Sequence, residues 1–200
     1  MPDKRFIAVN RSGSLTKEQH YQLMNWACEC VENVLPLLGE SIYERLINAL
    51  LIAKEWTQGK ATVGDERNAS VQAHDVARAS SNPVKIALAR AVGHAVATAH
   101  MADHSLEAAV YALKAVKYAG KSVEEERNRQ NELLPLEIKE LVLSTRGQKE
   151  QGFIDLRNIS LQSEVPSDWT TRMPDGTSNC ILKLFKYYMG CSPFVGQKKP

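Results

Sequence analysis

The stretch from residue 82 to residue 120 constrains the fold of this chain more than any other. After Pro83 it contains no further proline, and its interior holds a single glycine, Gly93. Asn82 directly before Pro83 is a strong start signal, because asparagine caps helices and the first helical position tolerates the missing proline N–H. One straight helix of this length would extend roughly 55 Å at 1.5 Å per residue, which is long for a compact domain.

We therefore expect two helices in this stretch, separated by a break or tight turn near residues 102–104. Asp103 or Ser105 is the predicted cap of the second helix, because both side chains can accept a hydrogen bond from a free backbone N–H. One continuous helix is the alternative.

Small side chains line one side of the first of these helices. Such rows let another helix approach closely, because nothing larger than a methyl group separates the two axes. We predict a tightly packed central helix, and a cofactor groove along the same surface is the alternative. The two adjacent rows consist of Ala87, Ala91, Ala95 and Ala99, and of Gly93 and Ala97.

Helical signals continue from residue 14 to about residue 146. Thr16 and Gln19 form a capping-box pattern, and apolar residues recur behind them at three- and four-residue spacing up to Pro36. Further helices are predicted at about 41–56, from Thr62 or Gly64 to about 80, from Ser122 to about 134, and from Pro135 to about 146. The predicted fold is all-α: a compact bundle of about six helices with a less regular C-terminal extension.

This pattern divides the chain into three parts. Residues 1–13 form an N-terminal arm, residues 14–146 an all-helical domain, and residues 147–200 a C-terminal extension. The extension is set apart because its helical periodicity fades while prolines, glycines and turn signals accumulate.

Charge and composition exclude several partners. The 25 Lys and Arg residues nearly equal the 23 Asp and Glu residues, so the formal net charge is only +2. A chain so close to neutral gives no signature of nucleic-acid or membrane-surface binding. No apolar run approaches the roughly 20 residues that cross a bilayer. With only four cysteines and no signal-peptide pattern, we expect a reduced, cytoplasmic protein.

Histidines concentrate in the alanine-rich stretch. His100 and His104 are four residues apart, a helical spacing that lets two imidazoles bind one metal ion. His94 lies about 120° from His100 around an ideal helix, so we expect it to stay apart from the pair. We favour junction histidines that hydrogen-bond to Asp103, Asp75 or backbone carbonyls, without a metal. The alternative is a metal site with ligands drawn from His74, His94, His100, Asp103 and His104, close to Glu107.

Patterns for nucleophilic or cofactor-dependent catalysis are missing from the sequence. Cys28 and Cys30 lie on a predicted amphipathic helix, where buried thiols are inert. There is no Gly-x-Ser-x-Gly, no glycine-rich phosphate loop and no dinucleotide fingerprint. We therefore expect a protein that is not an enzyme and binds no cofactor. Trp26 and Trp56 are predicted to pack in the core; on the surface they would be binding hot spots.

The central block resembles the signature of a known family. It reads Arg90-Ala-Val-Gly-His94-Ala-Val-Ala-Thr-Ala-His100-Met-Ala-Asp-His104-Ser-Leu-Glu-Ala-Ala-Val-Tyr111-Ala-Leu-Lys114-Ala. Upstream, the matching pieces are Leu15-Thr-Lys-Glu-Gln-His20, Trp26-Ala-Cys28, Val34-Leu-Pro36, Ala49-x3-Ala53-x2-Trp56, Gly59 and Val63-Gly64-Asp-Glu-Arg67. Over roughly residues 14–146 the chain resembles a small all-helical bacterial family of immunity proteins of polymorphic toxin systems, in the group similar to the fifth immunity type.

The resemblance implies stoichiometric binding of a cognate protein toxin. Such a protein would occlude the toxin's active site or hold it closed, through a few buried anchors ringed by polar contacts. The resemblance supplies no catalytic residues. Glu107 departs from it, because that position looks like one the family usually fills with a small residue, and residues 147–200 match nothing in it. The candidate contact residues lie on charged helix faces: Arg45, Glu55, Asp65, Glu66 and Arg67.

Two other functions stay open from the sequence. One is a metal-binding helical protein, enzyme or sensor, that uses the cluster of His94, His100 and His104. The other is a helical scaffold or homo-oligomer in which the alanine row packs against a second subunit.

Overall fold

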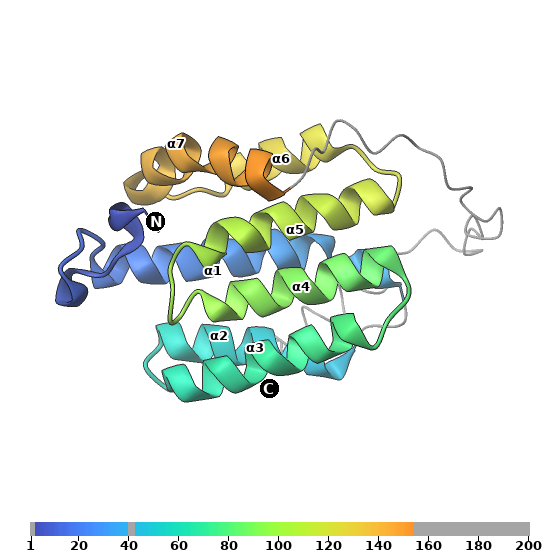
Figure 1. Cartoon of the computed structure of the whole chain (residues 1–200), viewed down its shortest axis with the longest axis horizontal. Helices are drawn as coiled ribbons and strands as arrows, with labels where there is room; N and C mark the ends of the chain where they lie inside the picture. Colours follow the sequence, from blue (N-terminus) through green and yellow to red (C-terminus); the bar gives the residue numbers. More distant parts are fainter. Residues whose placement is uncertain (1–2, 40–42, 154–200) are drawn as a thin grey trace, which may run out of the picture. The chain divides into compact units, whose positions relative to one another are not determined.

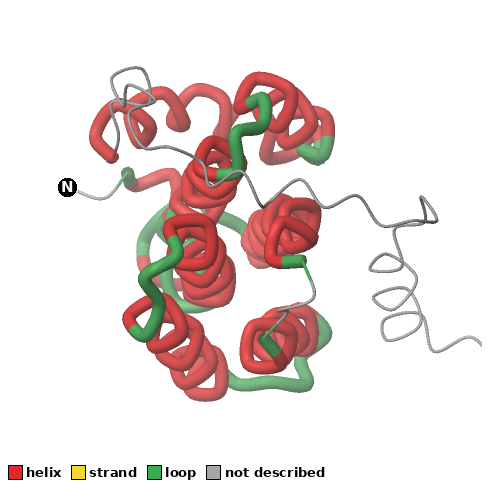
Figure 2. The backbone as a smooth tube through the Cα atoms, turned by 90° about the vertical axis from the view of Figure 1, so that its right-hand side faces the viewer, coloured by secondary structure: helices red, strands yellow, loops and turns green. Residues whose placement is uncertain are grey.

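The computed structural model describes residues 3–39 and 43–153, which form an all-helical bundle (Figure 1). Its α-helices are α1 (Lys17–Val34), α2 (Glu44–Thr57), α3 (Val63–Arg78), α4 (Pro83–Ala97), α5 (His104–Tyr118), α6 (Val123–Glu132) and α7 (Leu136–Phe153). Short 3-10 helices are η1 (Lys4–Phe6), η2 (Val9–Arg11) and η3 (Leu35–Leu38). The tube in Figure 2 has no strand in these ranges, and Ala8 and Leu15 form an isolated bridge. The predicted all-α class is confirmed.

The antiparallel pair of α4 and α5 lies at the centre of the bundle (Figure 1). The first helix, α1, packs against both members of the pair. Helices α2 and α3 cover one side of this centre, and α6 and α7 cover the other (Figures 1 and 2). None of the described helices combines the length and the apolar character that crossing a membrane requires.

The helix starts follow the local signals of the sequence. Thr16 accepts a hydrogen bond from the Gln19 backbone N–H, and the Gln19 side chain completes the capping box at the start of α1. Thr62 caps α3 in the same way with Asp65. Asn82 caps α4 by accepting from the Lys85 N–H. Each of these caps satisfies a backbone donor that the helix cannot pair internally.

The predicted break between α4 and α5 is confirmed, but its predicted caps are wrong. Asp103 occupies the N-cap position of α5 without capping it, because its side chain accepts a hydrogen bond from Lys149 instead. Ser105 donates to the Ala102 carbonyl oxygen. We call residues 98–103 the α4–α5 connection.

Two further helix boundaries differ from the sequence prediction. The helix expected to begin near residue 41 begins at Glu44, and residues 40–42 lie outside the described residues. The start of α6 agrees with the prediction, because the Ser122 hydroxyl caps the helix by accepting a hydrogen bond from the Glu125 N–H. The last helix does not end near residue 146 but continues through Gly147 to Phe153. Residues 154–200, most of the predicted extension, lie outside the described residues.

The alanine rows of α4 lie in the core, as predicted for a tightly packed central helix. Ala91 and Ala95 are fully buried, and Ala87 and Ala99 are nearly so. Other helices of the same bundle cover this surface, so it is not open to a second subunit. Trp26 is also buried, as predicted, and its indole N–H donates to the Gln130 carbonyl oxygen at 2.8 Å.

Gly93 marks a close approach of α3 to α4. A Cβ atom added at this position would lie 2.6 Å from Cε1 and 2.7 Å from Nε2 of His74. One turn earlier on α3, the Ser70 hydroxyl donates a hydrogen bond to the Gly93 carbonyl oxygen at 2.8 Å. The imidazole of His74 therefore occupies the space that any larger residue at position 93 would need.

Gly93→Ala is expected to destabilise the protein by about 1–3 kcal/mol, because the added methyl group overpacks the His74 ring. At an open helical position the same change stabilises the protein by roughly 0.5–1 kcal/mol. The sign of the change in unfolding free energy therefore identifies the close contact. Chemical denaturation measures the difference.

Gly64→Ala is the matched control, because the nearest atom to its added Cβ would be Thr62 Oγ1 at 3.4 Å. This change should be neutral or stabilising. In a His74→Ala background, Gly93→Ala should cost much less than in the wild-type chain. If Gly93→Ala destabilised the His74→Ala variant as much as the wild-type chain, the close contact of Gly93 with His74 would be contradicted.

Candidate functional site

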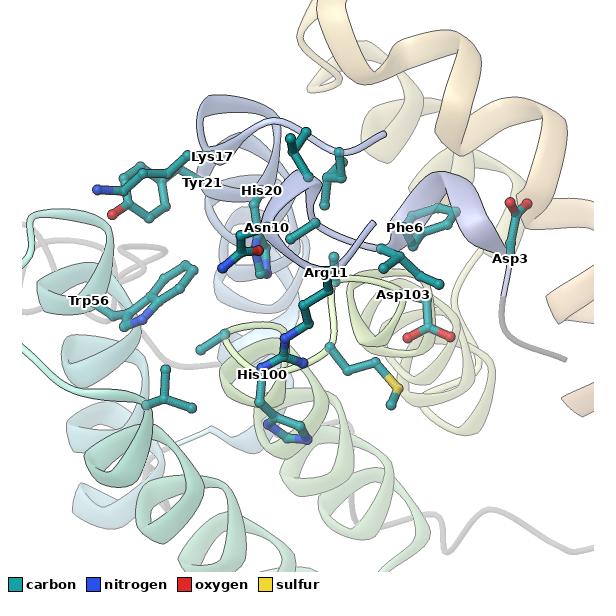
Figure 3. A pocket seen from close by; sticks show the side chains of 18 residues that line it. Asp3, Phe6, Asn10, Arg11, Lys17, His20, Tyr21, Trp56, His100 and Asp103 are labelled. Carbon is teal, nitrogen blue, oxygen red and sulfur yellow. The ribbon is translucent and has the colours of Figure 1, made fainter. Parts of the chain in front are cut away.

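A pocket and a cluster of histidines meet at the α4–α5 connection. The pocket has a volume of about 790 Å³ and lies between the segment Asp3–Leu15, the start of α1, the end of α2 and the α4–α5 connection (Figure 3). His100 and Asp103 line it from that connection. On the other side of the connection, His104 begins α5 and faces into the histidine cluster.

Aromatic side chains of two helices form one wall of the pocket. Trp56, near the end of α2, makes edge-on contacts with the rings of His20 and Tyr21 on α1, at centroid distances of 5.1 Å and 5.0 Å. His20 Nε2 lies 2.6 Å from the Thr98 carbonyl oxygen. Burial lowers the pKa of His20, and the hydrogen bond to Thr98 only partly opposes this. Trp56 packs against the core, as predicted, but it is only partly buried and its ring also lines the pocket.

Apolar and cationic side chains surround the opening. Val9, Met101 and Val63 line the pocket and are 59%, 44% and 37% exposed. Arg11 and Lys17 also line it, and neither forms an ion pair with any residue of 3–39 or 43–153. We call the pocket and these five residues, together with Trp56, the pocket face.

The histidine cluster is a chain of four rings in contact, carried by α3, α4, the α4–α5 connection and α5. His74 and His94 have centroids 5.1 Å apart, and His94 and His104 have centroids 5.3 Å apart. His104 is in turn 5.3 Å from His100. Tyr111 stacks on His94 at 5.1 Å with an angle of 8° between the ring planes.

Glu107 is the polar centre of this cluster. Its Oε2 lies 2.5 Å from Nδ1 of His104 and 3.0 Å from Nδ1 of His94. Its Oε1 accepts a hydrogen bond from Nζ of Lys149 at 3.1 Å, and Lys149 also donates to Asp103 Oδ2 at 3.2 Å. Burial alone would raise the pKa of Glu107, but its contacts with His104, His94 and Lys149 hold it well below its usual range.

The other two imidazoles of the cluster lack such partners. Nδ1 of His74 and Nδ1 of His100 are buried, and neither has a hydrogen-bond partner among the described residues. Burial lowers the pKa of both rings, that of His74 to about 4, and neighbouring histidines contribute. These two rings therefore favour the neutral form at neutral pH.

The structure brings the predicted histidines together in a different arrangement from the one expected. His94 does not stay apart. Because the chain reverses at the α4–α5 connection, His94 on α4 lies next to His104 on α5. The main hydrogen-bonding partner is Glu107 and not Asp103 or Asp75, because Asp103 binds Lys149 and Asp75 pairs with Arg78.

Lys149 was not a candidate from the sequence. It lies beyond the predicted end of the domain and 42 residues from Glu107 in the chain. The one feature of the sequence that points to Lys149 is its helical spacing from Ile138 and Val142, two buried residues of α7. Cys28 and Cys30 are buried free thiols with raised pKa values, mainly because of burial, as expected for thiols without a catalytic role.

One of the predicted contact residues, Glu66, does not lie on the surface. It was expected on a charged surface, but it is fully buried in α3, and neither carboxyl oxygen has a hydrogen-bond partner within the described ranges. Burial, followed by the charge of Asp65, raises the pKa of Glu66 from 4.5 to about 8. The other four predicted contact residues are exposed: Arg45, Glu55, Asp65 and Arg67.

Glu66→Gln is expected to stabilise the protein by roughly 1–3 kcal/mol at pH 9 and by much less at pH 5. The folded-state pKa lies above the ordinary value of 4.5, so the fold favours the neutral acid. Stability from this group is fully present below about pH 4.5 and is lost as pH rises through about 8. Denaturation at pH 5, 7 and 9 measures the trend.

Asp3→Asn provides the control for this prediction. Hydrogen bonds from Arg5 hold the pKa of Asp3 below its usual value, so Asp3 is ionised throughout this pH range, and its charge does not contribute to the raised pKa of Glu66. The stability difference caused by Asp3→Asn should therefore not change between pH 5 and pH 9. A pH-independent difference for Glu66→Gln would contradict the raised pKa of Glu66.

Comparison with known proteins identifies one family. A family model described as "Imm-5 like putative immunity protein" matches residues 13–137, more than half of the chain. The matched range contains α1 to α6 and all four rings of the histidine cluster. Lys149 lies beyond it. No curated protein and no solved structure gives a significant match.

Proposed function

The chain belongs to the Imm-5 like family of putative immunity proteins, and from this premise we propose that it neutralises a cognate protein toxin by stoichiometric, non-catalytic binding. The family match is the observation that carries the proposal. It covers the central α4–α5 pair and the helices that pack on it. Action in the cytoplasm, expected from the cysteine content, is part of the same proposal.

The pocket face is our proposed contact surface for the toxin. Partly exposed aromatic and apolar side chains beside a concave site are typical of the anchors that carry most of the energy of protein binding. Trp56 suits this role because His20 and Tyr21 already hold its ring from two sides. An ordered side chain loses little conformational freedom when a partner binds.

The charges of the pocket face define the chemistry of the partner segment. Asp103 is paired with Lys149, and Asp3 is paired with Arg5. Arg11 and Lys17 are the remaining charged residues of the lining and have no ion pair with any described residue. The surface therefore suits a toxin segment with an apolar side chain for the pocket and a carboxylate beside it.

The first experiment tests the function itself. The gene next to the one for this chain should encode a toxin, and co-expression of the two should restore growth that the toxin alone prevents. The two purified proteins should form a 1:1 complex in gel filtration. A neighbouring region without a toxin gene, together with no partner in a pull-down from the native host, would contradict the proposed function.

Variants of the pocket face test its role once the toxin is in hand. Trp56→Ala is expected to weaken toxin binding by at least about 2 kcal/mol, roughly thirtyfold, as is typical of an aromatic anchor. Met101→Asp should weaken binding as well, because it adds a negative charge where an acidic segment is expected. Isothermal titration calorimetry measures both changes.

Leu136→Asp is the matched control for Met101→Asp. Leu136 is 84% exposed at the start of α7, outside the pocket lining. This change should leave toxin affinity unaltered. If Trp56→Ala and Met101→Asp bind the toxin as tightly as the wild-type chain does, the pocket face is not the interface, even where the immunity function holds.

A further inference from the structure

The centre of the histidine cluster contains three metal-binding atoms that converge on one point. His94, His104 and Glu107 each direct one ligand atom to it, and these atoms all lie within 4.8 Å of one another. The α4–α5 connection produces this convergence: it places the last turn of α4 beside the first turn of α5. On α5, His104 and Glu107 are three residues apart and so share a helix face.

We propose that His94 Nδ1, His104 Nδ1 and Glu107 Oε2 form a binding site for a divalent transition-metal ion of the Zn²⁺ class. Two imidazoles and one carboxylate are a known ligand set for Zn²⁺, which takes four ligands in a tetrahedron. The fourth position is then filled by water or by an incoming group. This site is independent of the proposed toxin binding.

The two distances from Glu107 Oε2 to the imidazole nitrogens suit this ion after a small adjustment. With metal–ligand bonds of about 2.0–2.1 Å, neighbouring ligand atoms of a tetrahedral site are about 3.3 Å apart. Glu107 Oε2 lies 3.0 Å from His94 Nδ1 and 2.5 Å from His104 Nδ1. These two distances need to lengthen by less than about 1 Å, which side-chain rotation provides.

Hydrogen bonding leaves part of this centre unsatisfied without an ion. His94 Nδ1 is buried and close to Glu107 Oε2, but it has no hydrogen-bond partner of acceptable geometry among the described residues. A buried nitrogen in this position normally finds a partner, because leaving it unpaired costs free energy. A metal ion at the convergence point would bind this nitrogen and the carboxylate together.

Neighbouring residues hold the ligands in place. Tyr111 stacks on the His94 ring and restricts its orientation. Lys149 binds Glu107 Oε1 and leaves Oε2 for the ion, and contacts of this kind are what tune metal sites from outside the ligand shell. The Lys149 cation faces two carboxylates, those of Glu107 and Asp103, so the carboxylates leave one net negative charge to stabilise a divalent cation.

The test is direct metal binding by the full-length protein purified without a histidine tag and stripped with a chelator. Titration with Co²⁺ should give the visible absorption bands of a tetrahedral site. Added Zn²⁺ should displace the Co²⁺ and remove these bands. Calorimetry with Zn²⁺ should give about one ion per chain and a higher melting temperature. Glu107→Gln, which keeps the shape of the side chain, should reduce affinity at least about tenfold. His104→Ala should abolish the Co²⁺ spectrum.

His20→Gln is the matched control, because His20 is the remaining histidine of the chain and lies outside the cluster. It should bind Zn²⁺ and Co²⁺ as the wild-type chain does. Circular dichroism establishes whether each variant is folded. If His104→Ala does not fold, Glu107→Gln alone decides whether the site binds metal. Less than about 0.1 equivalent of bound Zn²⁺ in the wild-type chain would overturn the proposal. Unaltered affinity in Glu107→Gln would overturn it as well.

Discussion

The close packing of α4 against its neighbours is the constraint on which the rest of the structure depends. Alanines and Gly93 on this helix let the flanking helices approach to a distance that larger side chains would prevent. At Gly93 the space left by the missing side chain is filled by the imidazole of His74, which then contacts His94. The same feature that allows dense packing therefore places histidines from two helices in contact. The histidine cluster is thus a consequence of the close packing of α3 against α4.

A second constraint is electrostatic and comes from the charges buried on α5. A buried carboxylate is costly unless it is paired, and a single cation rarely satisfies it. Glu107 solves this with two imidazoles on one oxygen and Lys149 on the other, while Lys149 also binds Asp103. Because Lys149 belongs to α7, this network ties the last described helix to the centre of the bundle. Glu66 is the opposite case: its carboxyl oxygens have no hydrogen-bond partner among the described residues, and burial raises its pKa.

The sequence predicted those parts of the structure that depend on neighbouring residues. Thr16 with Gln19, and Asn82 with Pro83, are local signals, and the helices begin where these residues indicate. The contact of His94 with His104 was not predictable in this way, because it depends on the chain reversing between them. Lys149 was missed for the same reason, since it meets Glu107 through the packing of α7 on α5. Burial of single polar residues, such as Glu66, depends on which face of a helix the neighbours cover, and an amphipathic pattern of alanines defines that face poorly.

The α4–α5 connection joins the two proposed sites and explains why each can be tested without the other. Met101 is exposed at the pocket, which His100 and Asp103 also line, while Asp103 binds Lys149 and the neighbouring His104 binds Glu107. A short connection fixed by contacts on both sides moves little, and a surface held in this way loses little entropy when it binds a partner. A metal ion at His94, His104 and Glu107 would hold the inner side of the same connection more firmly. The histidine cluster therefore lies against the inner side of this connection, whereas the proposed toxin contacts belong to the residues that face outward.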